Sequence, residues 1–321
     1  MNFLITGITG FVGSHLADFL LDNNLGTVHG IKRWRSPLEN IEHRLDQIKL
    51  YNCDLRDLSS LITTLDKIKP DVIFHLAAQS LVPTSYIAPV DTLETNVVGT
   101  VNLLEAIRLL NIDPVFHCCG SSEEYGNVTE KDIPIKETHP LNPISPYALS
   151  KVGEDRAAFM YWKAYGIKTV ISRMFTHTGP RRSSEFFIPS FAKQLVEIEM
   201  GLKPPIVHVG NLDSIRTIAD VKDAVRAYWL LATNCDYGEA YNIGGKTTKS
   251  VGEILDMLCS LSTAKNITIK VDPKRLRPAD ATLQIPDISK FVNKTGWEPK
   301  IPLEQTLRDV LNYWRYKLNG I

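Results

Sequence analysis

Three glycines close to the start of the chain, Gly7, Gly10 and Gly13, constrain its fold more than any other feature. They follow a strand-like apolar run at residues 3–6 and open a segment at 13–23 that has a helical pattern. Glycine at such a junction permits a tight turn and lets the backbone at a helix N-terminus approach a pyrophosphate. A turn that only needs a positive φ also selects glycine. The order of strand, glycine loop and helix favours the first reading and predicts a dinucleotide-binding unit.

Strand-like runs alternate with helical patterns through the first half of the chain. The runs are 3–6, 28–32, 48–53, 72–76, 115–119 and 169–173, and the helical patterns are 13–23, 58–68, 95–110 and 146–165. This alternation predicts an α/β fold, a Rossmann-type doubly wound parallel sheet with helices on both faces. Prolines interrupt the regularity after about residue 174, where we expect a smaller C-terminal α/β substrate domain with helices at 250–261 and 303–318. The expected division is 1–173 for dinucleotide binding and 174–321 mainly for the substrate, with a strand at 240–245 returning to the first sheet.

The composition excludes several classes of protein. Lys+Arg and Asp+Glu number 36 each, and charged residues make up 22%, so nothing points to nucleic acid or an anionic membrane. No apolar run approaches the ~20 residues of a membrane span, and the first strand follows Met1 too closely for a signal peptide. The five cysteines lack CxxC spacing, and the eight histidines lack metal-ligand spacing. We therefore expect a cytoplasmic protein with reduced thiols and no metal.

Cationic residues at the end of the second predicted strand bear on the choice of dinucleotide. A carboxylate there would bond the ribose 2′-hydroxyl of NAD, whereas arginine accommodates the 2′-phosphate of NADP. This chain carries Lys32, Arg33 and Arg35 and no acid, which favours NADP over NAD, although a solvated basic turn would look the same. Asp54, after the third strand, is placed either to bond the adenine amino group or to cap the next helix.

Tyr147 and Lys151 stand four residues apart at the start of a predicted helix, so both side chains lie on one face. An ammonium near a phenol favours phenolate and lowers the pKa of the tyrosine toward the range of a general base. After the fifth strand, Ser121, Ser122 and Glu123 add hydroxyls and a carboxylate that could reach the same site. Tyrosine, lysine and a hydroxyl suit removal of a proton from an alcohol while a hydride leaves its carbon. Glu123 suggests a further proton transfer, but a carboxylate beyond a strand is also commonly a cap or an ion-pair residue.

The chain resembles, over nearly its whole length, the extended short-chain dehydrogenases/reductases that act on nucleotide sugars. The motifs that carry the resemblance are Gly7-x-x-Gly10-x-x-Gly13, His75-Leu76-Ala77-Ala78-Gln79, Thr95-Asn96-Val97-Val98-Gly99-Thr100, Tyr147-x-x-x-Lys151 and Tyr241-Asn242-Ile243-Gly244. Segments 28–33, 179–182 and 210–216 are similar to GDP-mannose 4,6-dehydratases, and 176–183 and 215–217 look closer still to GDP-N-acetylglucosamine 4,6-dehydratases. The run GSSEEYG at 120–126 instead resembles GDP-4-keto-6-deoxymannose reductases, because Glu124 replaces the apolar residue usual in dehydratases.

The resemblance implies a role for individual residues. Tyr147 would be base and acid at the sugar C4 hydroxyl, Lys151 would hold the nicotinamide ribose, and Ser121 would hydrogen-bond the C4 oxygen. Glu123 matches the carboxylate that removes the C5 proton, and Ser122 stands where some relatives place an acid for the leaving C6 hydroxyl. The implied cofactor-binding residues are Gly7, Thr9, Gly10, Phe11, Val12, Gly13, Lys32, Arg33, Arg35, Asp54, Leu55, Leu76, Ala77, Ala78, Asn96, Tyr147, Lys151, His177 and Arg182. The implied substrate-binding residues are Ser121, Glu123, Tyr147, Lys193, Arg216, Arg277 and Asp280.

The sequence therefore predicts an enzyme, a GDP-sugar 4,6-dehydratase that converts GDP-mannose or GDP-N-acetylglucosamine to the GDP-4-keto-6-deoxy sugar. A reductase of that keto sugar, consuming NADPH and using Glu123 only structurally, is the first alternative, and a nucleotide-sugar epimerase is the next. A cofactor-binding protein without turnover is a further reading, against which the complete set of Ser121, Tyr147 and Lys151 argues. The resemblance also implies a homodimer or homotetramer.

Overall fold

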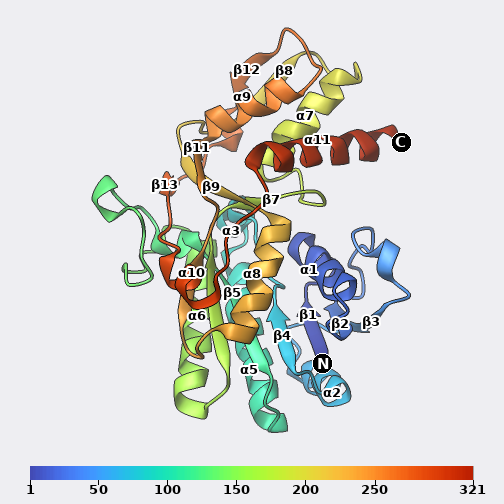
Figure 1. The fold of residues 1–321 in the computed structure, drawn as a ribbon, viewed down its shortest axis with the longest axis vertical. Coiled ribbons are helices and arrows are strands. Elements are labelled where there is room, and N and C mark those ends of the chain that lie inside the picture. The colour runs from blue at the N-terminus through green and yellow to red at the C-terminus, as the bar shows by residue number, and fades with distance from the viewer. Residues whose placement is uncertain (321) are drawn as a thin grey trace.

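The computed structural model, which describes residues 1–320, is organised around a seven-stranded sheet of order β10-β6-β5-β4-β1-β2-β3 (Figure 1). Its strands are β1 (Asn2–Thr6), β2 (Thr27–Lys32), β3 (Ile48–Asn52), β4 (Val72–His75), β5 (Val115–Ser121), β6 (Thr169–Met174) and β10 (Ala240–Ile243). Every neighbouring pair is parallel, and the expected α/β fold is confirmed. The strand order reverses between β1 and β4, so the carboxyl ends of these strands open a crevice of the kind in which α/β proteins bind ligands.

Helices cover both faces of this sheet, which makes it doubly wound. One face carries α1 (Phe11–Asp22) and α8 (Val221–Asn234), and the other carries α2 (Leu58–Ile68), α5 (Gly99–Leu110) and α6 (Pro146–Tyr165). Phe3 and Ile5 of β1 pack into the core with α1 and α8, whereas Leu4 packs into the core with α2, α5 and α6. Successive side chains of a strand point to opposite faces, so a strand covered on both sides is apolar at every position.

A smaller lobe, at the top of Figure 1, lies beyond the carboxyl edge of the sheet. Its elements are β7 (His177–Thr178), α7 (Phe187–Glu199), β8 (Ile206–Val209), β9 (Ile215–Asp220), β11 (Thr247–Ser250), α9 (Val251–Leu261), β12 (Thr268–Val271), β13 (Leu283–Gln284) and α11 (Leu303–Asn319). Strands β11, β13 and β7 all pair with β9, and β12 pairs with β8. Apolar side chains of α7, α9 and α11, among them Leu195, Ile254 and Leu307, form a separate core.

Parts of the second half of the chain return to the large sheet. Helix α8 packs against α1, and β10 pairs with β6, with Ala240 opposite Ile171. Helix α10 (Ser289–Thr295) packs on β10 and α8. Three short helices, α3 (Val82–Ile87), α4 (Pro89–Leu93) and the π-helical turn η2 (Glu94–Val98), precede α5. Short 3₁₀ turns lie at η1 (Glu42–Arg44), η4 (Glu130–Asp132) and η5 (Pro273–Arg275). No helix within residues 1–320 is long and apolar enough to cross a membrane.

Candidate active site

A cavity of about 1160 Å³ lies between the carboxyl edge of the large sheet and the smaller lobe. Its wall includes the loops after β1, β2, β3, β4, β5 and β6, the starts of α6 and α7, and parts of β9, β13, α11 and segment 272–280. Pockets for one drug-sized ligand typically measure about 300–1,000 Å³, so this cavity is larger than a single such ligand needs. The cavity occupies the place at which the strand order predicts a ligand site.

The glycine loop forms the wall of the cavity at the sheet. Gly7 has a φ of +69°, and a Cβ on this residue would lie 2.9 Å from the Cα of Ala77. A Cβ on Gly13 would overlap the carbonyl oxygen of Gly7, so glycine lets α1 begin close to β1. Gly10 is the N-cap of α1, whose first turn carries no acidic side chain. Thr9, Phe11 and Val12 complete this wall. The helix N-terminus therefore faces the cavity and fits a pyrophosphate.

Side chains at the ends of β2, β3 and β4 extend this wall. Lys32 and Arg33 line it after β2, and Asp54 and Leu55 line it after β3. Arg56 donates its amide to Asp54 (3.0 Å), and its guanidinium bonds lower the pKa of that carboxyl, so Asp54 is an ionised acceptor at neutral pH. Leu76, Ala77 and Ala78 follow β4. With the glycine loop, these residues fit an extended nicotinamide dinucleotide along the carboxyl edge of the sheet.

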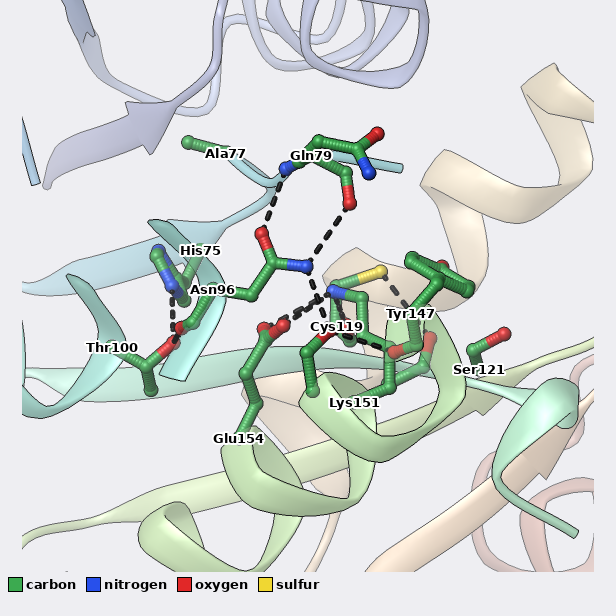
Figure 2. A network of polar contacts seen from close by, with 12 residues as sticks. His75, Ala77, Gln79, Asn96, Thr100, Cys119, Ser121, Tyr147, Lys151 and Glu154 are labelled. Atoms are coloured by element: carbon green, nitrogen blue, oxygen red, sulfur yellow. Dashed lines mark hydrogen bonds and ion pairs between the residues drawn. The ribbon is translucent and has the colours of Figure 1, made fainter. Parts of the chain in front are cut away.

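Tyr147 and Lys151 reach the cavity from the first turns of α6 (Figure 2). The helix begins at Pro146, a residue well suited to the first turn, and Ser145 accepts a hydrogen bond from the amide of Ala148 (3.0 Å). This cap fixes the start of α6 at the cavity wall, and the four-residue spacing places the phenol and the ammonium on one face.

Competing influences set the acidity of the Tyr147 phenol. Desolvation raises the pKa of Tyr147 to about 12, whereas the Lys151 ammonium and then the Ser121 hydroxyl act in the opposite direction. The sequence predicted a lowered pKa for Tyr147, which is wrong because desolvation outweighs the ammonium. Lys151 is fixed by a hydrogen bond from Nζ to the carbonyl oxygen of Cys119 (2.8 Å). Ser121 ends β5 and lines the same cavity, so the structure brings the three side chains together.

Two adjacent glutamates after β5 have opposite surroundings. Ser121 caps the 3₁₀ turn η3 (Ser122–Tyr125), and its amide donates a hydrogen bond to Oε1 of Glu124 (2.6 Å). Glu124 is fully buried, lies 3.5 Å from Arg173, and has its pKa raised by burial. Glu123 instead lines the cavity, with 15% of its side chain exposed. The turn therefore directs Glu124 into the core and Glu123 toward bound ligands.

Charged side chains surround the end of the cavity at the smaller lobe. Nη1 of Arg277 lies 3.5 Å from Oε1 of Glu123 and 3.5 Å from Oδ1 of Asp280. Arg216 of β9 lies 3.4 Å from the same Asp280 oxygen, and Ser214 donates a hydrogen bond to the other oxygen (2.9 Å). Two guanidinium groups thus converge on one carboxylate, an arrangement that can bind a diphosphate with paired hydrogen bonds.

His177 and Arg182 line the cavity close to the glycine loop. The His177 ring stacks on Phe11 with 5.8 Å between centroids, and burial together with Arg182 lowers the pKa of His177 to about 3. Arg182 donates a hydrogen bond to the carbonyl oxygen of His177 and lies 4.1 Å above the ring of Phe186. A neutral imidazole and a fixed cation therefore stand beside the start of α1.

Asn96, predicted to bind the cofactor, is not part of the cavity wall. It is fully buried, and its side chain accepts a hydrogen bond from the amide of Gln79 (2.7 Å) and donates to the hydroxyl of Ser150 (2.8 Å). Figure 2 shows this amide between the loop after β4 and α6. Asn96 therefore connects the loop after β4 to α6, two parts of the cavity wall, without lining the cavity itself.

Two predicted cationic ligands also lie outside the wall. The guanidinium of Arg35 lies 4.4 Å above the ring of Trp34, and the ammonium of Lys193 lies 5.4 Å from the centroid of Trp314. Gln284, in contrast, lines the cavity although no sequence pattern predicted it. Ser122 donates a hydrogen bond to Oε1 of Gln284 (3.0 Å). A glutamine in the two-residue strand β13 belongs to no motif, so only its pairing with β9 brings it here.

A Rossmann sheet whose ligand cavity is shared by a glycine loop and a tyrosine–lysine pair on one helix defines the class of nicotinamide-dependent short-chain dehydrogenases/reductases. Within residues 1–320, no three His, Cys, Asp or Glu side chains gather so as to hold a metal ion. The family model for GDP-mannose 4,6 dehydratase matches residues 4–310, and the protein belongs to this family of enzymes.

Individual relatives divide between two reactions. A GDP-mannose 4,6-dehydratase of Vibrio cholerae is 34% identical over 349 residues, covering 96% of this chain and 92% of the relative. A GDP-6-deoxy-D-mannose reductase of Pseudomonas aeruginosa is 30% identical over 314 residues, covering 98% of this chain and 97% of the relative.

Solved structures of similar proteins contain both kinds of nicotinamide dinucleotide. The RMD protein of Pseudomonas aeruginosa complexed with NADPH superposes with a TM-score of 0.85 at 28% identity, covering 98% of this chain and 99% of that one. A dTDP-glucose 4,6-dehydratase of Streptomyces venezuelae with NAD superposes with a TM-score of 0.85 at 26% identity, covering 100% of this chain and 98% of that one. The comparisons thus support a nicotinamide dinucleotide as the cofactor.

Proposed function

We propose that the protein is a GDP-sugar 4,6-dehydratase that converts GDP-mannose or GDP-N-acetylglucosamine to the GDP-4-keto-6-deoxy sugar. The observation that carries this proposal is the orientation of the two glutamates. Glu123 lines the cavity with Ser121 and Tyr147, whereas Glu124, the residue that made the motif resemble a reductase, is fully buried. A carboxylate at the cavity is needed for water loss at C5 and C6, and a reductase does not need it.

Tyr147 begins the reaction as a general base at the C4 hydroxyl. The Lys151 ammonium stabilises the phenolate, and Ser121 donates a hydrogen bond to the C4 oxygen as that carbon is oxidised. The bound dinucleotide supplies the hydride acceptor for C4 and later the hydride donor for C6. Tyr147 keeps the proton taken from the C4 hydroxyl until hydride has returned to C6. The resulting enolate then gains a proton at C5, from Tyr147 or by exchange with solvent, which restores the C4 ketone.

Glu123 acts next, at C5. A ketone at C4 acidifies the C5 proton, and the Glu123 carboxylate removes it while the C6 hydroxyl leaves as water. Ser122 is a poor acid, and its proton is already donated to Gln284. Glu123, once protonated, is therefore the group that delivers a proton to the leaving hydroxyl, directly or through water.

Residues at the two ends of the cavity bind different ligands in this proposal. We propose that segment 1–173 with β10 holds the cofactor and that 174–321, apart from β10 and α8, holds most of the GDP-sugar. Arg216 and Arg277 suit the diphosphate, and Asp280 orients both guanidinium groups. Lys32 and Arg33 favour NADP, because they line the cavity after β2 where a carboxylate would select NAD.

The proposed assembly is a homodimer or homotetramer. Ile87 and Val90, 85% and 65% exposed, lie on short helices that pack against α6, which itself exposes Leu149. An apolar patch of this kind favours contact between subunits. We also propose a cytoplasmic location, because all five cysteines are free, as expected for a reducing compartment.

A substrate deuterated at C4 tests the proposed reaction. A dehydratase that returns the same hydride produces GDP-4-keto-6-deoxy sugar with deuterium at C6. A reductase of the keto sugar, the second candidate favoured by its 30% identical relative, would leave the labelled substrate unchanged and oxidise added NADPH when given a GDP-4-keto sugar. Deuterium retained at C4 of an epimerised product would identify an epimerase.

A further inference from the structure

Glu154 is a buried carboxyl group directly behind Lys151. It lies one turn further along α6, is 1% exposed, and forms an ion pair of 3.1 Å with the Lys151 ammonium. Oε2 of Glu154 accepts the hydrogen bond from Nζ of Lys151 (3.1 Å), and Oε1 accepts none from any residue in 1–320. Figure 2 shows Glu154 on the opposite side of Lys151 from the Tyr147 ring. Glu154 does not line the cavity, so it acts on bound ligands only through Lys151.

The position of Lys151 between a phenol and a carboxyl has an electrostatic consequence. Burial alone would lower the pKa of Lys151, but Glu154 and then Tyr147 raise it overall, so the ammonium stays charged. The positive charge favours the Tyr147 phenolate, and an ionised Glu154 cancels part of it. Burial raises the pKa of Glu154 to about 7, with Lys151 acting against it, so its charge changes near neutral pH.

Other titratable groups around Lys151 keep one charge state near neutral pH. On β4 and β5, burial lowers the pKa of His75 and of His117 to about 3, so both imidazoles are neutral. Burial also raises the pKa of Cys118 and Cys119 on β5, and both remain thiols.

The remaining charges near α6 are paired elsewhere or exposed to solvent. Arg173 of β6 binds Asp155 at 2.9 Å and lies 3.5 Å from Glu124 of η3, whose pKa is raised by burial. Glu105 of α5 pairs with Arg108. Asp91 of α4 and Glu94 of η2 are exposed. Within the described part of the chain, Glu154 is therefore the group whose charge at Lys151 changes near neutral pH.

We propose that Glu154 is a positioning residue that holds the Lys151 ammonium and, when ionised, opposes its effect on Tyr147, and so sets the pH at which Tyr147 accepts the substrate proton. The inference rests on the proposed role of Tyr147 as the base at C4. It adds a residue that touches neither cofactor nor substrate and that no motif of the chain singled out.

The variant Glu154→Gln tests the inference, because it removes the charge and keeps an oxygen that can accept from Lys151. The acid limb of the pH profile of kcat/KM should move to lower pH by about one unit, as expected for one charge acting over several ångströms at an effective dielectric constant of about 20. Ionisation of Tyr147 can also be followed without substrate, by the ultraviolet absorbance of tyrosinate. The absorbance of the matching Tyr147→Phe variant is subtracted at each pH, so that only Tyr147 contributes. In Glu154→Gln this difference should begin to rise at a pH lower than in wild type by a similar amount.

The matched control is Glu304→Gln, which removes another Glu–cation pair within one helix, with Arg308 of α11 outside the cavity, and should leave both curves unmoved. Glu154→Asp keeps the charge but moves it away from Lys151 by the length of one methylene, so its curves should fall between those of wild type and Glu154→Gln. The aspartate variant also tests the inference if the glutamine variant does not fold. Curves that stay in place, or that move to higher pH, would overturn the inference. Lack of turnover in the wild type would contradict the proposed function instead, and the absorbance titration would then decide on Glu154 alone.

Discussion

Nη1 of Arg277 lies 3.5 Å from Oε1 of Glu123, so the carboxylate proposed to act at C5 is ion-paired with an arginine proposed to bind the diphosphate. Binding of a diphosphate would draw the guanidinium away from Glu123, because two phosphates carry more negative charge than one carboxylate. The Glu123 carboxylate is then no longer held by this arginine. The relationship links substrate binding in the smaller lobe to proton removal at the large sheet.

Glu123→Gln should block water loss and spare oxidation at C4. The glutamine amide keeps the size of the side chain but cannot accept the C5 proton, so the rate of dehydration should fall about a thousandfold. Mass spectrometry would follow the dehydrated product, and absorbance of the reduced dinucleotide would follow C4 oxidation in a single turnover. Dehydration at the wild-type rate would make Glu123 a structural residue.

The neighbouring glutamates should differ in their effect on stability. Glu124→Ala removes a fully buried side chain and its bond to the Ser121 amide, and should lower the free energy of unfolding by about 3 kcal/mol. Glu123→Ala breaks only a long pair at the edge of a cavity and should cost about 0.5 kcal/mol or less. Urea denaturation of the two variants provides the comparison. Equal losses would show that both side chains are structural.

Arg277→Gln should weaken binding of the nucleotide sugar more than it slows the reaction. A charge-assisted hydrogen bond to phosphate contributes about 1.5–3 kcal/mol, so KM should rise roughly 10- to 100-fold. The matched control is Arg308→Gln on α11, where the arginine pairs with Glu304 outside the cavity. An unchanged KM in Arg277→Gln would place the diphosphate elsewhere.

Acid should destabilise the smaller lobe through Glu199. Burial acts to raise the pKa of Glu199, but hydrogen bonds from Arg315 and Ser262 lower it to about 2. Since the folded pKa lies below the ordinary value of 4.5, the stabilisation is complete above pH 4.5 and is lost as pH falls toward 2. Thermal unfolding measured across this range should show a smaller decline in Tm for Glu199→Gln than for wild type. Parallel curves for the two proteins would exclude Glu199 as the cause.

The first half of the fold could be predicted because local signals agree with the tertiary structure. The helices predicted at 58–68 and 146–165 coincide with α2 and α6, and both begin at side chains that cap them, Asp57 and Ser145. Parallel strands covered on both faces are apolar throughout and stand out from their neighbours. The expected strand at 115–119 ends at Ser121 in the structure, which carries this residue to the cavity.

The second half was less predictable because its elements depend on distant partners. Helix α8 was missed, although Val221 and Tyr228 are fully buried, because its apolar face is explained only by its return to α1. The opposite directions of Glu123 and Glu124 follow from a 3₁₀ turn that no residue pattern marked. Lys193 was predicted from the family resemblance alone, and its contact with Trp314 depends on how α7 and α11 pack.

The most direct test of the account is incubation of the wild-type protein with GDP-mannose or GDP-N-acetylglucosamine and no added reductant. The hydride taken from C4 returns to C6, so a 4,6-dehydratase reaction yields a product lighter by one water with no net consumption of dinucleotide. Unchanged GDP-sugars, together with oxidation of NADPH when a GDP-4-keto-6-deoxy sugar is supplied, would contradict it and identify a reductase.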